Sequence, residues 1–174
     1  MQKIIFILLA STVLLFSGCS EKKVENPNIQ TINSLTNDIT VGKTFQNITL
    51  KNQFDKPINL SNKTKKVIFV FQKASGHTAR NFINSKPDDY LSNKNIAFIA
   101  DISGMPSIIA SMFAVPDLKK HKYSVMLIRD EKLSAKYRND KYEDYIAIIS
   151  LNDFKITNIK LVSTDKQLEE TLGK

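Results

Sequence analysis

Very few side chains of this chain could carry covalent or acid–base chemistry. Its 174 residues include one cysteine, Cys19, and two histidines, His77 and His121. A single cysteine can form neither an internal disulfide nor a CxxC redox pair, and it cannot supply a cysteine-rich zinc site. His77 could act as an acid, a base or a ligand. The simpler interpretation of His77 is an exposed loop histidine, because no nucleophile partner accompanies it.

Cofactor signals are equally sparse. A metal site needs about three protein ligands, and His77, His121 and Asp101 do not have a recognised spacing. The chain has five glycines and no GxGxxG motif, so a flavin or nicotinamide cofactor is not expected. A haem attachment motif is missing too. We therefore expect neither a metal nor another cofactor.

The segment Ser75-Gly76-His77-Thr78 precedes a predicted helix that carries Arg80 in its first turn. Free backbone N–H groups at a helix start, together with an arginine, could hold an anion. Ser75 or Thr78 could equally serve as the side-chain cap of that helix. The cap is the simpler of these two hypotheses.

The amino terminus has the pattern of an export signal. A short positive start is followed by a nearly continuous apolar run over residues 4–16, and the small residues Ser17 and Gly18 precede Cys19. The run is shorter than the roughly 20 residues that a membrane span needs. The ending Leu-Phe-Ser-Gly-Cys resembles the bacterial lipoprotein signal. That resemblance implies removal of residues 1–18 and acylation of Cys19; a plain secretory signal and an uncleaved anchor are the alternatives.

The lipoprotein resemblance also implies a place in the cell. An acylated Cys19 would leave the mature protein anchored to a membrane, facing the periplasm, and without a free thiol. Ser20 stands where Asp often signals inner-membrane retention in such lipoproteins, which favours the outer membrane. Residues 19–40 are polar and without a sustained period, so they predict a flexible tether. Residues 41–174 then predict one domain.

The pattern of residues 41–174 predicts an α/β sandwich with a central mixed sheet flanked by helices. Three apolar runs predict buried strands, at residues 67–71, 96–100 and 125–128. Helices are predicted near residues 78–85, after Pro106, and at residues 134–138. An N-terminal β-hairpin is predicted around the turn at residues 55–57, and a second hairpin around Asn152-Asp153. A capping box from Thr164 to Gln167 predicts the start of the last helix.

In the helix predicted after Pro106, apolar residues recur on one side. Ile108, Ile109, Met112 and Phe113 share that side. Such a stripe is typical of an amphipathic helix.

The order of these segments resembles the thioredoxin fold, in the style of TlpA-like oxidoreductases and peroxiredoxins. The residues that carry the likeness are 55–60, 66–71, 123–130 and 146–156. A narrower resemblance, to the YtfJ-type exported proteins, rests on residues 75–80, on Asp101 with Gly104, and on Met112-Phe113.

The departures from this family concern its chemistry. Thioredoxin-type exchange needs a thiolate at a helix N-terminus and a second cysteine three residues later. By the resemblance these two places fall at about Gly76 and Ala79, and neither residue carries sulfur. The place of the family's cis-proline falls near Tyr145. Thiol-dependent peroxidase chemistry would lack its thiolate as well.

The chain carries a formal net charge of +8. Basic residues cluster at residues 63–66 and 119–122, but no nucleic-acid motif accompanies them, and we expect no nucleic-acid partner. Attraction to anionic lipid or to an acidic partner is one interpretation, and a solvated surface is the other.

Together these patterns predict a membrane-anchored lipoprotein whose redox-inactive thioredoxin-like domain is a binding or scaffolding module of the cell envelope. Its expected partners are the membrane, through Cys19, and another envelope protein. The alternative is a protein related to thiol-disulfide oxidoreductases or peroxiredoxins that retains a redox-linked role through a partner. The predicted contact residues are Ser75, Gly76, His77, Thr78, Arg80, Asp101 and Tyr145.

Overall fold

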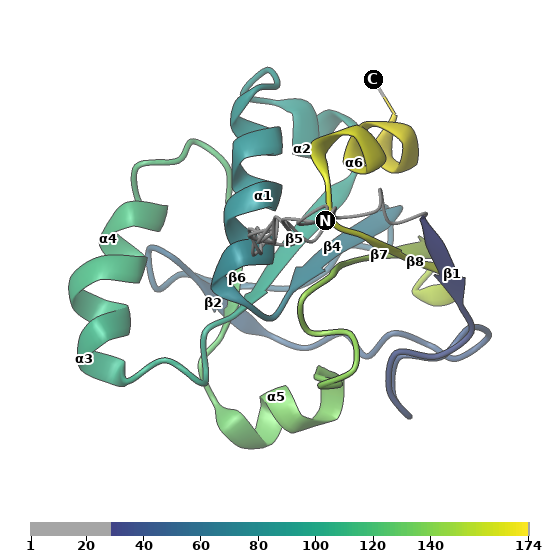
Figure 1. Ribbon diagram of the computed structural model, residues 1–174, viewed down its shortest axis with the longest axis horizontal. Coiled ribbons are helices and arrows are strands. Elements are labelled where there is room, and N and C mark those ends of the chain that lie inside the picture. Colours follow the sequence, from purple (N-terminus) through teal and green to yellow (C-terminus); the bar gives the residue numbers. More distant parts are fainter. Residues whose placement is uncertain (1–28, 174) are drawn as a thin grey trace, which may run out of the picture.

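The computed structural model describes residues 29–173, which form one eight-stranded mixed sheet with helices on both faces (Figure 1). The strand order is β1-β8-β7-β4-β5-β6-β2-β3. The strands are β1 Gln30–Ile32, β2 Leu50–Asn52, β3 Pro57–Ile58, β4 Lys66–Val70, β5 Ile96–Asp101, β6 Met126–Ile128, β7 Ile146–Asn152 and β8 Lys155–Val162. The helices are α1 Lys73–Asn84, α2 Tyr90–Asn93, α3 Ser107–Ile109, a π-helical segment η1 Ala110–Ala114, α4 Val115–Leu118, α5 Glu131–Tyr137 and α6 Asp165–Leu172.

Strand β4 lies at the centre of the sheet, parallel to β5 and antiparallel to β7. Its alternate residues enter two different apolar clusters. Val67 and Phe69 pack on the face covered by α5 and by residues 35–60, whereas Ile68 and Val70 pack on the face covered by α1, α2 and α6 (Figure 1). A strand covered on both faces must be apolar at every position, which explains the continuous apolar run.

The main elements predicted from the sequence are confirmed. The three apolar runs form β4, β5 and β6, and β7 and β8 form the second hairpin. Asp153 and Phe154 in its turn have φ values of 47° and 63°, the left-handed region that such tight turns use. The N-terminal hairpin consists of β2 and β3, which extend the sheet beyond β6. Thr164 and Gln167 form the capping box of α6.

The prediction of a flexible tether is wrong for residues 29–40, its second half. Strand β1 pairs with β8, and Leu35 and Ile39 are buried in the cluster beside α5. The Thr36 hydroxyl donates a hydrogen bond to the Lys136 carbonyl at 2.8 Å. The isolated apolar residues of this polar segment are thus core residues, and the domain begins by residue 29. The predicted signal, Cys19 and the first part of the tether lie outside the described residues.

The apolar stripe after Pro106 does not face the core. Ile108, Ile109, Met112 and Phe113 all face solvent. The helical stretch of residues 107–118, hereafter the crossover helix, packs on the sheet through its other side, where Leu118 is buried and Val115 half-buried. Apolar residues occupy both sides of this helix, so the pattern alone does not indicate which side is inward. None of the helices within residues 29–173 combines the length and apolarity that crossing a bilayer requires.

The integration of residues 29–40 can be tested by Leu35→Ala. Leu35 is 1% exposed, so its truncation should lower the free energy of unfolding by about 2 to 5 kcal/mol. Val41→Ala, at a partly exposed apolar position just after this segment, should change it by about 0.5 kcal/mol or less. Urea unfolding of both variants measures the two values. Equal, small changes would mean that residues 29–40 do not belong to the core.

Candidate functional site

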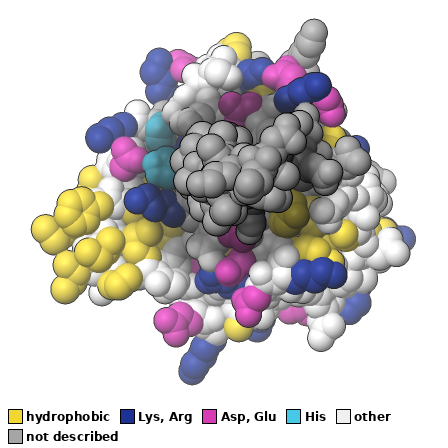
Figure 2. Space-filling view, viewed as in Figure 1, with side chains coloured by type: hydrophobic (Ala, Val, Ile, Leu, Met, Phe, Trp, Pro, Cys, Tyr) yellow, Lys and Arg dark blue, Asp and Glu magenta, His cyan; other side chains and the backbone are white. Residues whose placement is uncertain are grey.

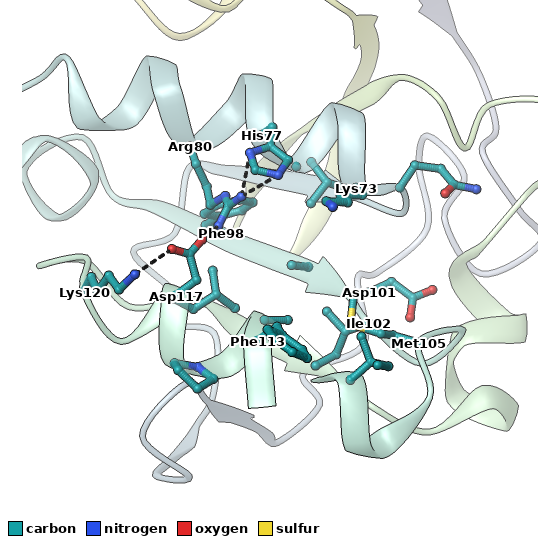
Figure 3. Close-up of a pocket in the computed structure, with 18 of the residues that line it drawn as sticks. Lys73, His77, Arg80, Phe98, Asp101, Ile102, Met105, Phe113, Asp117 and Lys120 are labelled. Carbon is teal, nitrogen blue, oxygen red and sulfur yellow. Dashed lines mark hydrogen bonds and ion pairs between the residues drawn. The ribbon is translucent and has the colours of Figure 1, made fainter. Parts of the chain in front are cut away.

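A cavity of about 620 Å³ lies between α1 and the crossover helix, at the carboxyl ends of β4 and β5 (Figure 3). Val70, Phe98 and Ala100 line it from the sheet, and Met112 and Phe113 line it from the crossover helix. Its volume is in the usual range of small-molecule and peptide side-chain sites, about 300 to 1,000 Å³. The carboxyl ends of parallel strands are where open α/β sheets usually bind ligands.

One wall of the cavity is the first half of α1, which begins five residues earlier than predicted. The helix starts at Lys73, directly after the extended residue Gln72, and the Gly76 N–H donates to the Gln72 carbonyl at 2.9 Å. Ser and Gly are poor helix formers, so the sequence alone favours a loop at Ser75-Gly76. Burial of Ala79, Phe82 and Ile83 on the sheet outweighs that local preference.

This early start removes both hypotheses for the Ser75–Thr78 segment. Neither Ser75 nor Thr78 caps the helix, because both lie inside it; the Ser75 hydroxyl donates to the Gln72 carbonyl and that of Thr78 to the Ala74 carbonyl. The anion site at this place is not formed either. Arg80 is on the second turn and already has a carboxylate partner.

That partner is Asp117 on α4. Arg80 Nη1 lies 2.6 Å from Asp117 Oδ2, and Lys120 Nζ lies 3.4 Å from the other oxygen of this carboxylate. The second guanidinium nitrogen, Nη2, lies 2.8 Å from His77 Nδ1 (Figure 3). The same nitrogen lies 3.2 Å from His77 Nε2, so the guanidinium faces both ring nitrogens, and the nitrogen without a proton accepts from it.

The surroundings of His77 favour its neutral form. Burial lowers the pKa of the imidazole first, and the positive charges of Arg80 and Lys73 lower it further; Asp117 acts in the opposite direction. Burial and Arg80 also lower the pKa of His121. Burial raises the pKa of Tyr123, which stacks on His121, to about 12. At neutral pH, His77 is thus an uncharged group that accepts from Arg80 through its unprotonated ring nitrogen.

Asp101 lies at the edge of the cavity and organises its rim. One carboxylate oxygen accepts the Ser103 N–H at 2.9 Å, and the other accepts the Ser134 hydroxyl at 2.5 Å. These two bonds fix the loop after β5 against α5. Because both oxygens are used and the side chain is 9% exposed, the evident role of Asp101 is to position this loop.

The structure brings four of the seven predicted contact residues to one place. Gly76, His77, Arg80 and Asp101 line the cavity. Ser75 is buried and Thr78 is not part of the lining. Tyr145 is elsewhere: it packs against the cluster beside α5, and its hydroxyl accepts from Gln30 Nε2 at 3.4 Å.

Sequence reasoning missed Asp117 and the crossover-helix wall. A signal for Asp117 existed. Helix α1 carries Lys73 and Arg80 but no acidic residue, so a partner for Arg80 had to come from another element. Asp117 is the first charged residue after the uncharged stretch 102–116. Across the described part of the chain, no three His, Cys, Asp or Glu side chains converge as a metal site would require.

The coupling of Arg80 to the histidines can be tested by Arg80→Met. Removing its charge should raise the pKa of His77 and that of His121 toward the ordinary value of about 6.5. An NMR titration of the imidazole carbon-bound protons measures both. Lys132→Met, which removes an exposed charge on α5, should change neither pKa. Unchanged midpoints in Arg80→Met would contradict this electrostatic coupling.

No family model and no curated protein matches this chain. Several solved structures do. It is similar to a putative protein disulfide isomerase from Bacteroides thetaiotaomicron (TM-score 0.51, 18% identity, 80% of this chain and 89% of that one). It is also similar to peroxidoxin BcpB from Mycobacterium tuberculosis (TM-score 0.52, 14% identity, 76% and 93% covered). A third is a putative thiol:disulfide interchange protein DsbE from Chlorobium tepidum (TM-score 0.52, 13% identity, 76% and 94% covered). These likenesses show that the chain has a thioredoxin-like fold.

Proposed function

We propose that this protein is a binding module of the bacterial cell envelope, in which the thioredoxin-like domain holds a partner segment in the cavity beside α1 and performs no thiol exchange. The observation that carries this proposal is the composition of the cavity. It lies at the start of α1, the place where thioredoxin-type chemistry needs a thiolate, and residues 71–80 contain no cysteine.

The helix start keeps the electrostatics of a thiol site without the thiol. Backbone N–H groups at a helix N-terminus lower the pKa of a cysteine placed there. Here the first turn is Lys-Ala-Ser-Gly. Gly76 lines the cavity, and Ala79, the second place suggested by the family resemblance, is fully buried. Cys19, the one cysteine of this chain, precedes the described domain.

The chemistry of the cavity suits a peptide segment with an apolar side chain. Its lining is mainly aliphatic, aromatic and methionine side chains. The charge of Arg80 is paired with Asp117, and Lys73 and Lys120 are further cations of the lining. Neutral His77 carries one ring N–H, a donor suited to a carbonyl oxygen, the acceptor that every peptide carries. An envelope protein is therefore the partner that we propose.

The anchor is the second part of the proposal. The amino-terminal pattern supports removal of residues 1–18 and acylation of Cys19. Each acyl methylene buried in lipid contributes about 0.8 kcal/mol, so several chains would hold the protein at a membrane. We place it at the periplasmic face of the cell envelope, with the outer membrane favoured by Ser20.

A redox-linked role is the second candidate, favoured by the fold itself. Structures similar to this one are described as thiol-disulfide proteins. Because residues 29–173 have no cysteine, such a role would require a partner to supply the thiol, with the same cavity as the docking place.

The binding proposal is tested by site-specific photocrosslinking in intact cells. A photoreactive residue at Lys73, on the rim of the cavity, should give a discrete crosslinked partner. The second substitution Gly76→Phe should abolish that product, because the ring would enter the cavity. The backbone tolerates the change: a Cβ at Gly76 would lie 3.8 Å from Val70, an ordinary contact.

The matched control carries the photoreactive residue at exposed Thr157 on β8. It should give no such product. A Lys73 crosslink that survives Gly76→Phe, in a variant whose urea unfolding is unchanged, would mean that the cavity does not hold the partner.

A further inference from the structure

The crossover helix exposes an apolar patch, and three of its residues, Ile109, Met112 and Phe113, also line the cavity. Ile108, Ile109, Met112 and Phe113 are 67%, 45%, 63% and 63% exposed. Figure 2 shows the corresponding hydrophobic surface projecting at the left, over α3 and α4. Large apolar side chains that are exposed singly need no explanation, but a contiguous patch of four indicates an interaction surface.

The composition of this helix points to an apolar environment on both of its sides. Residues 102–116 contain no charged residue, in a chain in which 24% of residues are charged. The inner side packs on the sheet through Leu118 and Val115. A helix that is apolar all round is normally buried. The side that carries Ile108, Ile109, Met112 and Phe113, which includes part of the cavity lining, faces solvent in the domain itself, so an occupant from outside the domain would cover it.

Cationic side chains follow the apolar stretch immediately. Lys119, Lys120 and Lys122 lie at the carboxyl end of α4, and the side chains of Lys120 and Lys122 are 76% and 73% exposed. Their ion pairs with Asp117 and Asp88 are solvent-exposed and therefore weak. Lysines at the end of an interfacial helix can extend to lipid phosphates while the apolar side enters the acyl boundary.

From these observations we propose that the outer side of the crossover helix lies in the interface of an anionic phospholipid bilayer. The four apolar side chains enter the boundary between headgroups and acyl chains. Lys119, Lys120 and Lys122 contact lipid phosphates.

The length of chain before the domain agrees with this arrangement. Ile29 follows Cys19 by ten positions, which span at most about 35 Å. A domain of this size has a radius of gyration of about 15 Å, so a tether of this length holds its surface close to the bilayer. This closeness depends on the proposed acylation of Cys19, whereas the exposed patch does not.

Charge distinguishes a bilayer from a second copy of the chain as the occupant. In a two-fold dimer through this patch, the lysine cluster of each copy would lie near the lysine cluster of the other copy. These like charges would repel. An anionic surface instead attracts the cluster, at about 1 kcal/mol for each lysine near it. The net charge of +8 acts in the same direction.

The test uses a tryptophan reporter in the full chain, which has no tryptophan of its own. Phe113→Trp places the reporter in the patch. On addition of phosphatidylethanolamine–phosphatidylglycerol vesicles, its emission should shift to shorter wavelength, and brominated acyl chains should quench it. The control variant Val41→Trp, with its reporter at an exposed position next to β8, should show neither effect. Replacing the three lysines by glutamine should weaken the response to these vesicles and not the response to phosphatidylcholine.

Three outcomes would overturn the proposal. The first is an emission of the Phe113→Trp variant that vesicles leave unchanged. The second is an equal response of the Val41→Trp variant. The third is a blue shift without lipid that disappears on dilution, which would assign the patch to a second copy. Mass spectrometry of Cys19 tests acylation separately, so failure of the anchor and failure of the patch give different results.

Discussion

The site depends on one guanidinium group, that of Arg80. It joins two walls of the cavity that come from separate parts of the chain. Arg80 belongs to the helix that follows β4, and Asp117 to the helical stretch between β5 and β6. The Arg80 side chain is 15% exposed and that of Asp117 is 44% exposed, so solvent screens the pair in part. Because the ion pair spans the cavity beside α1, it sets the separation of the two walls. The same group contacts His77, whose pKa is lowered first by burial and then by the charge of Arg80.

The place of this cavity follows from the sheet. Parallel pairing of β4, β5 and β6 brings the start of α1 and the loop after β5 to one edge. This is the edge at which open α/β sheets usually bind ligands. The chain keeps that geometry and puts an apolar lining with a neutral histidine there. The crossover helix carries the exposed patch, and three of the patch residues, Ile109, Met112 and Phe113, also line the cavity. Partner binding and bilayer contact would thus meet at one element.

Much of the fold could be predicted because its signals are local. The runs that form β4, β5 and β6 are apolar at every position, and the turn at Asn152-Asp153 and the capping box at Thr164 are short-range motifs. Other features depend on contacts distant in sequence. Leu35 and Ile39 stand alone in a polar segment, and only pairing of β1 with β8 makes them core residues. Local propensity predicts too late a start for α1, because tertiary packing overrides the low helix propensity of Ser75-Gly76. The inward side of the crossover helix is undecidable from a pattern that is apolar on both sides.

The site was predicted in part for the same reason. His77, Arg80 and Asp101 follow apolar strands, and carboxyl ends of neighbouring strands come together in such sheets. The prediction of Tyr145 as a contact residue rested on the place of the family's cis-proline. Tyr145 lies on another surface. The pairing of Arg80 with Asp117 joins residues 37 positions apart, and the composition of α1 indicates only that a partner of Arg80 would come from another element. The lipid anchor at Cys19 remains a prediction from the amino-terminal pattern.

The central claim is that this thioredoxin-like domain has no thiol chemistry of its own. Insulin reduction and peroxide consumption, assayed with the full chain and with Cys19→Ser, test it most directly. We predict rates equal to the protein-free blank for both. Turnover in both chains would show an activity that needs no cysteine. Turnover that Cys19→Ser abolishes would show that Cys19 is a free, reactive thiol. Either result would contradict the account.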